Sequence, residues 1–397
     1  MSSAMSSVEE FRTAIRDWLR SQLTGEFAAL KGLGGPGREH EAFAERLAWE
    51  RHMAAHGWTC VGWPKEYGGR GASIEEQLAF HEEYALADAP ARVNHIGEQL
   101  LGPALIDHGT EEQKARFLPP IRAVEELWCQ GYSEPDAGSD LAAVRTRAVR
   151  DGDEWVVHGQ KIWTSLAHES QWCFVLARTE PRAEPRTEPR AESRTPGSRP
   201  HAGLSYLLVP LDQPGVDIRP IVQLTGTSEF NEVFFDGART AATHVVGAPG
   251  DGWRIAMATL GYERGVSTLG QQVGFRRELE ALIVLARANG AAADPLIRDR
   301  LVRAWTGLRT LRAHARTGTE PSLAKLSWSH WHRDLGELAM DVRGAAATLA
   351  AGEPYELDAW QRLFLFSRAD TIYAGSSEIQ RNIIAERVLG LPKEPRA

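Results

Sequence analysis

The sequence contains little cysteine and no long hydrophobic run. Its three cysteines, Cys60, Cys129 and Cys173, are isolated and odd in number. They exclude a disulfide framework and a cysteine-rich zinc site, and they suit a reducing cytosol. No apolar stretch approaches the roughly 18 residues that a membrane-spanning helix needs. The first residues, MSSAMSSVEEF, lack the basic and apolar segments of a secretory signal. We therefore expect a cytoplasmic protein without a membrane span.

Basic residues are not in excess either. The chain has 45 Lys and Arg against 53 Asp and Glu, a formal net charge of −8. Domains that bind nucleic acids normally carry a basic face, so this class of protein is disfavoured. What remains is a globular composition, with 43% hydrophobic and 25% charged residues in a chain of 397. That length allows two or three domains with a substantial core.

The first third of the chain is patterned as helices. Capping boxes at residues 7–10, 73–76 and 110–113 predict three helix starts, and the third helix is expected to end at Pro119-Pro120. A glycine-rich, aromatic segment at residues 57–71 interrupts them as a loop.

Around residue 127 the pattern changes to short strands. Segments at 144–150 and 155–157 flank Asp151-Gly152, a strong signal for a tight hairpin turn. Further strand-like segments lie at 172–176, 204–209 and 232–235. This spacing predicts a compact β barrel or sandwich of roughly 110 residues.

A repeat interrupts the strands. Residues 179–194 read TEPRAEPRTEPRAESR. The prolines forbid a regular helix, and the stretch has no large apolar side chain to bury. We expect residues 179–202 to form a solvated, mobile loop that joins two strands.

Beyond residue 250 the helical pattern returns. Helices are expected at 252–288, 295–315, 321–350 and 358–373, followed by a last helix capped by Ser376 or Ser377. Because the β part is inserted between two helical parts, these parts must meet to bury their apolar faces.

Three segments carry candidate chemistry. Residues 130–140 (QGYSEPDAGSD) have small residues that let backbone N–H groups and hydroxyls approach a ligand. Residues 161–165 (KIWTS) place an aromatic ring and hydroxyls at a strand end. Residues 373–382 (YAGSSEIQRN) form a helix break, and the N-terminus that follows it can receive an anionic or polar group.

In this order, the segments closely resemble the acyl-CoA dehydrogenase family. The resemblance covers nearly the whole chain and includes GW at 57–58, WPKEYGG at 63–69 and EFNEVFF at 229–235. It implies an α+β multidomain fold: an N-terminal helical domain (1–126), a middle β-barrel or sandwich domain (127–247) and a C-terminal four-helix-bundle domain (248–397). It also implies FAD, bound between the last two domains and touched by a neighbouring subunit.

Carried over by position, the resemblance implies a set of ligand contacts. Trp163, Thr164 and Ser165 would lie against the flavin ring, and Ser139 would meet the substrate near the thioester. The implied cofactor contacts are Gln130, Tyr132, Ser133, Gly138, Ser139, Trp163, Thr164, Ser165, Ser376 and Glu378. The implied substrate contacts are Ser139, Arg264, Tyr373, Ala374 and Gly375. No metal site is expected.

The implied reaction needs a carboxylate base, because the α-proton of a thioester is only weakly acidic. In many family members the base follows the Tyr of the last motif, but Ala374 stands there in this chain. In some branches the base lies on an earlier helix just before an Arg, and Glu263 precedes Arg264 at the matching place. Glu263 is therefore the expected catalytic residue, with a raised pKa beside an apolar acyl chain. The alternative is that Glu263 is an ordinary salt-bridged helix residue.

The leading hypothesis is α,β-desaturation of an acyl-CoA thioester by an FAD-dependent acyl-CoA dehydrogenase. Electrons would pass to an electron-transfer flavoprotein, and the enzyme would be a homodimer, a homotetramer or a heterotetramer. An acyl-CoA oxidase and a flavin monooxygenase are alternatives of the same fold. A partner subunit of a heteromeric dehydrogenase is another, favoured by Ala374. The family's Arg-x-x-Phe-Gly element, which reaches the FAD of a neighbouring subunit, is absent at residues 274–279.

Overall fold

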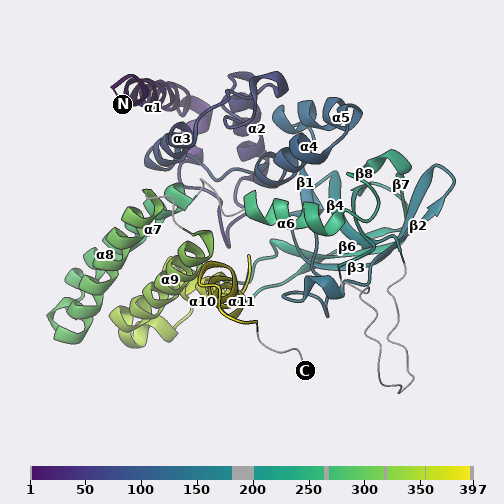
Figure 1. The fold of residues 1–397 in the computed structure, drawn as a ribbon. Coiled ribbons are helices and arrows are strands. Elements are labelled where there is room, and N and C mark those ends of the chain that lie inside the picture. The colour runs from purple at the N-terminus through teal and green to yellow at the C-terminus, as the bar shows by residue number, and fades with distance from the viewer. Residues whose placement is uncertain (1, 181–200, 263–267, 317–319, 354, 394–397) are drawn as a thin grey trace, which may run out of the picture.

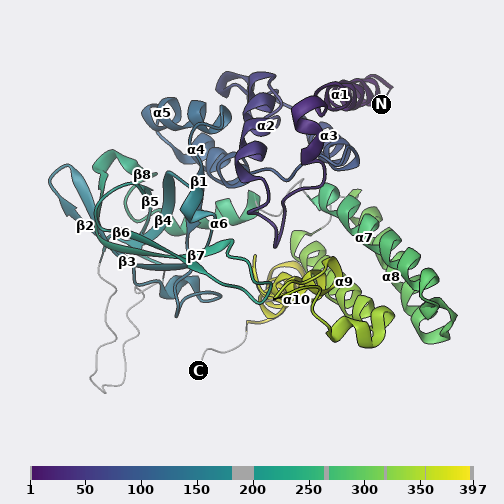
Figure 2. The ribbon, with the colours of Figure 1, turned by 180° about the vertical axis from the view of Figure 1, so that it is seen from behind.

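The computed structural model describes residues 2–180, 201–262, 268–316, 320–353 and 355–393. Helices come first, a β-sheet follows, and helices return at the end (Figure 1). Seen from behind, the N-terminal helices lie above both the sheet and the C-terminal helices (Figure 2). The predicted α+β order is therefore confirmed.

The N-terminal part is a helical pack. Its helices are α1 (Ser2–Gln22), α2 (Phe43–Ala55), α3 (Ile74–Leu86), α4 (Gly102–His108) and α5 (Glu111–Arg122), with a π-helical turn at Gly97–Leu101. The capping boxes at Ser73 and Thr110 are both present, with hydrogen bonds in each direction. These two helix starts were correctly predicted because the signal is local.

Two helix boundaries were predicted wrongly. Helix α1 begins at Ser2, so residues 7–10 lie inside the helix instead of capping it. The upstream Ala4 and Met5 are good helix formers, which lets the helix extend toward the N-terminus. Helix α5 continues past Pro119-Pro120 to Arg122. The prolines lie in its last turn. Each proline removes one backbone hydrogen bond of the helix, but little of the helix follows that could be disrupted.

In the part of the chain that the structure describes, eight strands form one sheet. They are β1 (Trp128–Gly131), β2 (Arg147–Asp151), β3 (Glu154–Ser165), β4 (Trp172–Arg178), β5 (Leu204–Pro210), β6 (Val216–Ile221), β7 (Phe230–Ala241) and β8 (Val245–Val246). The strand order is β6-β7-β3-β2-β4-β5-β8, and β1 pairs in parallel with β4. The predicted hairpin exists, but its turn is Gly152-Asp153 because Asp151 already pairs with Glu154.

Strand β4 is buried on both faces. Phe174 and Leu176 share a core with the N-terminal helices and with α6, whereas Cys173, Val175 and Ala177 enter the core between the strands. Burial on both faces explains why this strand is apolar from Trp172 to Ala177, without alternation. It also makes β4 the element on which the first two parts of the chain meet.

The C-terminal part contains α6 (Gly252–Tyr262), α7 (Thr268–Ala288), α8 (Pro295–Arg316), α9 (Pro321–Arg343), α10 (Ala359–Asp370) and α11 (Ser377–Ile383). Helices α7 to α10 share one core, which includes Leu279, Leu308, Leu335 and Leu363. The expected helix 252–288 is described as two helices, with residues 263–267 between them outside the described residues. Helix α9 ends earlier than expected because Gly344, at φ +58°, breaks it.

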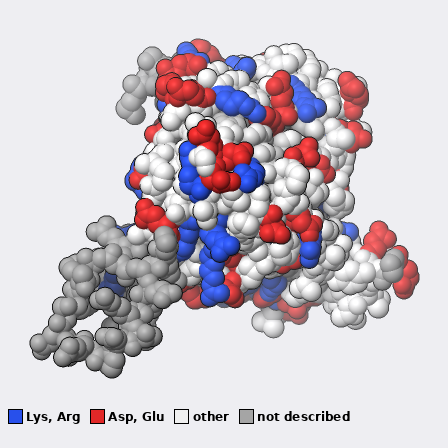
Figure 3. Space-filling view, turned by 90° about the vertical axis from the view of Figure 1, so that its right-hand side faces the viewer, with Lys and Arg blue, Asp and Glu red and all other residues white. Residues whose placement is uncertain are grey.

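Acidic and basic side chains are interspersed on the face displayed in Figure 3, without a broad basic area. This agrees with the net charge of −8. Among the described residues, no helix is both long and apolar enough to cross a lipid bilayer.

The β4–β5 hairpin generates a first prediction. Its pairs run from Trp172–Pro210 to Arg178–Leu204, and the Thr179 N–H donates to the Gly203 carbonyl at 2.9 Å. Residues 181–200, which hold most of the repeat, lie outside the described residues. Because the hairpin is closed without them, replacing 181–200 by a short Gly/Ser bridge should change the unfolding free energy by less than about 1 kcal/mol, since doubling a loop costs about 0.6 kcal/mol.

Urea unfolding and the flavin content of the purified variant would measure this effect. Failure of the shortened chain to fold, or loss of its flavin, would show that the repeat is structural.

Candidate active site

The first motif begins in β1 and ends at the surface. Tyr132 is buried, and Glu134 and Ala137 exchange backbone hydrogen bonds of 3.1 and 3.0 Å across a tight turn. Gly138 and Ser139 follow this turn and are exposed. A Cβ at Gly138 would meet no atom within 4 Å, so the backbone here is open to a ligand. Gln130 and Ser133 are half-buried beside it.

A buried ion pair joins this motif to the second one. Lys161 is fully buried, and its Nζ donates to Glu134 Oε1 at 2.8 Å, to the Tyr132 carbonyl at 3.0 Å and to the Leu176 carbonyl at 2.8 Å. All three ammonium protons are therefore used. The backbone N–H groups of Arg145 and Thr146 complete the shell around the Glu134 carboxylate, at 2.6 and 2.9 Å.

The same surroundings shift the charges of this pair. Burial alone would raise the pKa of Glu134, but the Lys161 ammonium holds it below its ordinary value. Burial lowers the pKa of Lys161, against the attraction of Glu134. Sequence reasoning quoted both residues within motifs but missed their pairing. The available signal was that Lys161 shares the odd-numbered positions of this strand with the apolar Trp155 and Val157.

The second motif contains a β-bulge. From Lys161 to Thr164, three steps along β3 face two steps along β7, from Val233 to Asn231. Trp163 lies in the bulge with φ +59° and an exposed fraction of 56%. A large residue in the left-handed region costs about 1–3 kcal/mol and is concentrated at functional sites. The Trp163 indole meets Phe230 edge-on, with ring centroids 6.1 Å apart.

Thr164 follows the bulge and faces inward. It is fully buried, and Asn231 Nδ2 donates to its carbonyl at 3.1 Å. Its Oγ1, in contrast, is buried without a hydrogen-bond partner in the described part of the chain. A buried hydroxyl normally has a partner. The exposed indole beside it, with half-buried Ser165 next in the strand, fits a planar aromatic ligand with a polar edge.

The third motif is a tight turn between α10 and α11. Ala374 and Gly375 have φ values of +51° and +91°, and Gln380 Nε2 donates to their carbonyls at 2.9 and 3.3 Å. Ser376 Oγ accepts the Ile379 N–H at 3.4 Å, so Ser376, and not Ser377, caps α11. No hydrogen bond leads from the Ala374 N–H to another described group. This donor is available to a ligand.

Two other predicted contacts frame this turn. Tyr373 is exposed, and its hydroxyl donates to Asp370 Oδ1 at 2.7 Å. Glu378 is exposed on α11; its pKa is lowered by the backbone N–H at the helix start and by the Ser376 hydroxyl.

The structure joins the first two motifs directly, since the Ile162 N–H donates to the Ser133 carbonyl at 3.0 Å. The third motif lies between α10 and α11. At the other end of α10, the Tyr355 hydroxyl donates to the Leu224 carbonyl between β6 and β7 at 2.9 Å. Glu263 and Arg264 lie outside the described residues. The flanking Tyr262 donates its hydroxyl to Asp107 on α4, and α7 packs on α3.

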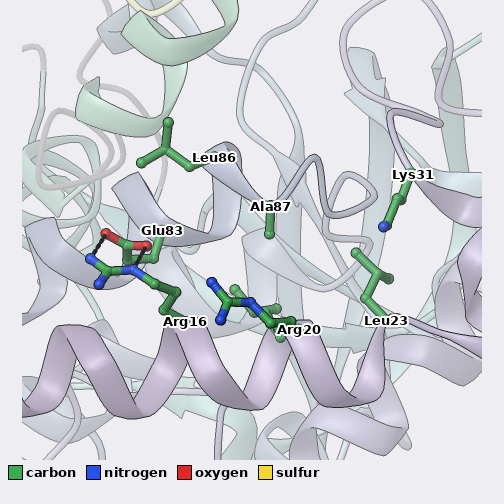
Figure 4. Close-up of a pocket in the computed structure, with 8 residues that line it drawn as sticks. Arg16, Arg20, Leu23, Lys31, Glu83, Leu86 and Ala87 are labelled. Carbon is green, nitrogen blue, oxygen red and sulfur yellow. Dashed lines mark hydrogen bonds and ion pairs between the residues drawn. The ribbon is translucent and has the colours of Figure 1, made fainter.

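A separate hollow of about 380 Å³ lies between α1 and α3 (Figure 4). It is lined by Arg16, Leu19, Arg20, Leu23, Lys31, Glu83, Leu86 and Ala87. Glu83 is already bonded to Arg16 at 2.9 and 3.0 Å and to Arg12 at 2.7 Å. None of the predicted site residues that the structure describes lines this hollow, so the motifs define the site and the hollow does not.

Three family models match the chain. They are "Acyl-CoA dehydrogenase, N-terminal domain" at residues 6–125, "Acyl-CoA dehydrogenase, middle domain" at 129–238 and "Acyl-CoA dehydrogenase, C-terminal domain" at 250–389. Acyl-CoA dehydrogenase IpdE1 of Mycobacterium tuberculosis is 65% identical, over 99% of this chain and 100% of that protein.

Two solved structures are also similar. "Tcur3481-Tcur3483 steroid ACAD" is 29% identical with a TM-score of 0.80, over 98% of both chains. The ChsE4-ChsE5 complex from Mycobacterium tuberculosis is 30% identical with a TM-score of 0.77, again over 98% of both chains.

The buried ion pair generates the second prediction. Lys161→Met should destabilise the protein by about 3–5 kcal/mol, because it leaves the Glu134 carboxylate buried without its partner. Arg239→Met is the matched control. Arg239 pairs with Asp151 and Glu154 at 2.9 and 2.8 Å on the exposed surface, and such pairs contribute at most about 1 kcal/mol. Urea unfolding measures both, and equal small losses would contradict a structural role for Lys161.

Proposed function

The chain belongs to the acyl-CoA dehydrogenase family, and on that premise we propose that it is an FAD-dependent enzyme that desaturates an acyl-CoA thioester between its α and β carbons. The observation that carries this proposal is the β3 bulge. An exposed Trp163 indole and the half-buried Ser165 lie at one strand end, where a flavin ring would cover the first and hydrogen-bond the hydroxyl of the second. When bound there, FAD supplies the acceptor for the β-hydride.

Four groups of residues would hold the cofactor. The Trp163 indole forms an apolar wall, and Ser165 offers a hydroxyl to the polar edge of the ring, while the buried Thr164 supports both residues from the core side. Gln130, Tyr132 and Ser133 support this edge from β1. The open backbone at Gly138 and Ser139 suits close approach of the ligand. Ser376 and Glu378 would contact it from the C-terminal turn.

The thioester would bind at the turn between α10 and α11. The Ala374 N–H is a fixed donor without a partner among the described residues, and it is aimed by the strained backbone of Ala374 and Gly375. A hydrogen bond from it to the thioester carbonyl stabilises the negative charge that develops when the α-proton leaves. Tyr373 and Ser139 flank the thioester in this assignment.

We assign the catalytic base to Glu263, with Arg264 beside the substrate. The segment that carries them runs between α6, which packs on α4, and α7, which packs on α3. A carboxylate in this place would take the α-proton directly. Ala374 cannot, so the chain needs a base from another element.

The names of the similar structures extend the proposal. One of them is a steroid ACAD, so we propose a thioester with a steroid-derived acyl group as the substrate class. Both structures are named for two proteins, so we also propose assembly with a second, related chain. Electrons would leave through an electron-transfer flavoprotein.

Two features of this chain bear on its assembly. The family's element that reaches a neighbour's flavin is absent at residues 274–279, and the two arginines there pair within the chain, Arg276 with Glu280 at 2.8 Å and Arg277 with Asp88. The outer surface of α8, at the edge of the bundle in Figure 1, exposes apolar side chains that a partner would cover. These are Leu296, Val302 and Trp305.

One experiment separates this proposal from its alternatives. The purified chain should be yellow, and a panel of acyl-CoA thioesters should bleach it anaerobically. Oxygen consumption after bleaching would identify an oxidase instead. Oxygen insertion without a need for Glu263 would identify a monooxygenase. A chain that is colourless until a second polypeptide is added would be a partner subunit or an incomplete half of the site.

The base assignment gives the third prediction. Glu263→Gln should keep the fold and the yellow colour but lose flavin reduction by at least about 100- to 10,000-fold, the value of a well-placed general base. The matched control is Glu280→Gln in the following helix, where the carboxylate only pairs with Arg276 and activity should persist. Stopped-flow bleaching measures both, and near-normal activity in Glu263→Gln would place the base elsewhere.

The position of Ala374 gives the fourth prediction. Ala374→Glu in the Glu263→Gln background restores a carboxylate near the same α-carbon. The rescue should be partial, because a base works only within about 3 Å of its proton. Flavin reduction above that of Glu263→Gln alone is the expected result. If FAD and thioester still bind and no recovery occurs, residue 374 does not face the α-carbon.

A further inference from the structure

Resting on the function proposed above, we propose that Asp370, held by the imidazolium of His332, is the positioning residue for the thioester-binding turn, and that this pair sets an alkaline limit to catalysis. The turn is defined as residues 371–377. Neither residue belongs to the motifs that identify the site, and neither touches the reacting atoms in the assignment given above.

Every acceptor oxygen of Asp370 has a hydrogen-bond partner. It is the last residue of α10 and is 2% exposed. Its Oδ1 accepts the Tyr373 hydroxyl at 2.7 Å, and its Oδ2 meets His332 Nδ1 at 2.5 Å. The Lys325 ammonium donates to its carbonyl. Asp370 therefore fixes the start of the turn to α9 through both its side chain and its backbone.

His332 is the other half of the pair. Its Nδ1 faces Asp370 and its Nε2 lies 3.0 Å from Glu278 Oε2 on α7. Carboxylates only accept hydrogen bonds, so both ring nitrogens must carry protons and the ring is an imidazolium. Burial alone would lower the pKa of His332, but the hydrogen bonds and charges of Asp370 and Glu278 raise it to about 9. The Phe275 ring packs on the imidazole, with the two ring centroids 4.4 Å apart.

The charges around this ring balance while His332 is protonated. Glu278 approaches from α7, Lys325 and His332 come from α9, and Asp370 comes from α10, giving two negative and two positive groups. Loss of the His332 proton leaves a net negative charge in a buried place. It also turns one ring nitrogen into an acceptor that faces a carboxylate oxygen, so the bond to either Asp370 or Glu278 is lost.

The turn is sensitive to this loss because its backbone is strained. Ala374 adopts φ +51°, a conformation that a residue with a Cβ keeps only when its surroundings impose it. Three sets of hydrogen bonds impose it. The Tyr373 hydroxyl donates to Asp370, the Gln380 amide donates to the carbonyls of Ala374 and Gly375, and the Ser377 N–H donates to the Thr371 carbonyl at 3.0 Å. A displacement of 1 Å in a group that holds a reacting substrate costs about 100-fold in rate.

The sign of the effect on stability follows from the direction of the shift. The folded-state pKa of His332 lies above the unfolded value of about 6.5. The stabilisation is therefore fully present below about pH 6.5 and is lost as the pH rises toward 9 and through it. Turnover and order in the turn should both decline on this alkaline side.

The test compares four variants. Asp370→Asn keeps an acceptor for Tyr373 but removes the charge, His332→Gln removes the titration, and Tyr373→Phe cuts only the hydroxyl bond. Asp358→Asn is the matched control, because Asp358 caps the opposite end of the same helix and pairs with Arg343, away from the turn. Tyr373→Phe is the safeguard if Asp370→Asn fails to fold.

The kinetic readout is kcat and KM for the thioester that bleaches best, measured from pH 6 to 10. We expect Asp370→Asn to lower kcat by about 10- to 100-fold with little change in KM. Tyr373→Phe should act in the same direction with a smaller loss. The wild type should lose activity with an apparent pKa near 9. That limb should disappear in His332→Gln and stay unchanged in Asp358→Asn.

The second readout needs no turnover. Amide hydrogen exchange of a peptide covering the turn, corrected for the intrinsic pH dependence, should rise in Asp370→Asn and in the wild type above pH 9. If no thioester bleaches the wild type, the proposed function fails, while exchange still decides whether the pair holds the turn. Unchanged exchange in Asp370→Asn, or an alkaline limb that survives in His332→Gln, overturns the proposal.

Discussion

The Lys161–Glu134 ion pair is the interaction on which the middle of this structure depends. A single ammonium group ties three segments together, because it bonds to Glu134 and the Tyr132 carbonyl after β1 and to the Leu176 carbonyl of β4. A buried pair of this kind contributes little net stability compared with a well-packed apolar pair. The pair instead fixes the position of β3 immediately before the bulge. The Trp163 side chain therefore points to solvent and the Thr164 side chain points into the core.

The C-terminal helices use the same device. A buried imidazolium and a buried carboxylate hold the turn that carries Ala374, as a buried ammonium and carboxylate hold the strand that carries Trp163. In both places the residue offered to a ligand has a positive φ without being glycine. Such backbone persists only when its surroundings over-determine it. Charge pairs suit this task, because removing one partner leaves the other buried and uncompensated, which makes any alternative arrangement costly.

Elements that are set by neighbouring residues could be predicted from the sequence, whereas elements that are set by distant partners could not. The capping boxes at Ser73 and Thr110 need only four consecutive residues and were found. Strands β1 and β8 were missed because they are short and are defined by partners far along the chain. Strand β6 was missed because its sequence, VDIRPI, contains charged residues and a proline, which an edge strand tolerates. The helix expected at 252–288 has an unbroken helical pattern, yet it is described as α6 and α7 with residues 263–267 outside the described part. The assignment of Glu263 therefore stays a prediction.

The site shows the same division. Its motifs could be quoted from the sequence because small residues and aromatics cluster in them, but their supports lie elsewhere. Asp370 and His332 are 38 residues apart, and no spacing rule links an aspartate at a helix end to a histidine on another helix. Lys161 was quoted in the second motif and Glu134 in the first, so their pairing was not predicted.

Ala374 brings these points together. The usual argument for a carboxylate at this position is chemical, but the backbone there sets a second condition. With φ at +51°, any side chain bears the same left-handed strain, so alanine gains no conformational freedom over glutamate. Alanine does keep the N–H, which is the group that the thioester carbonyl needs. If the base comes from the segment between α6 and α7, the turn needs only to hold the Ala374 N–H in place. The precision of that donor then depends on Asp370 and on the proton that His332 carries.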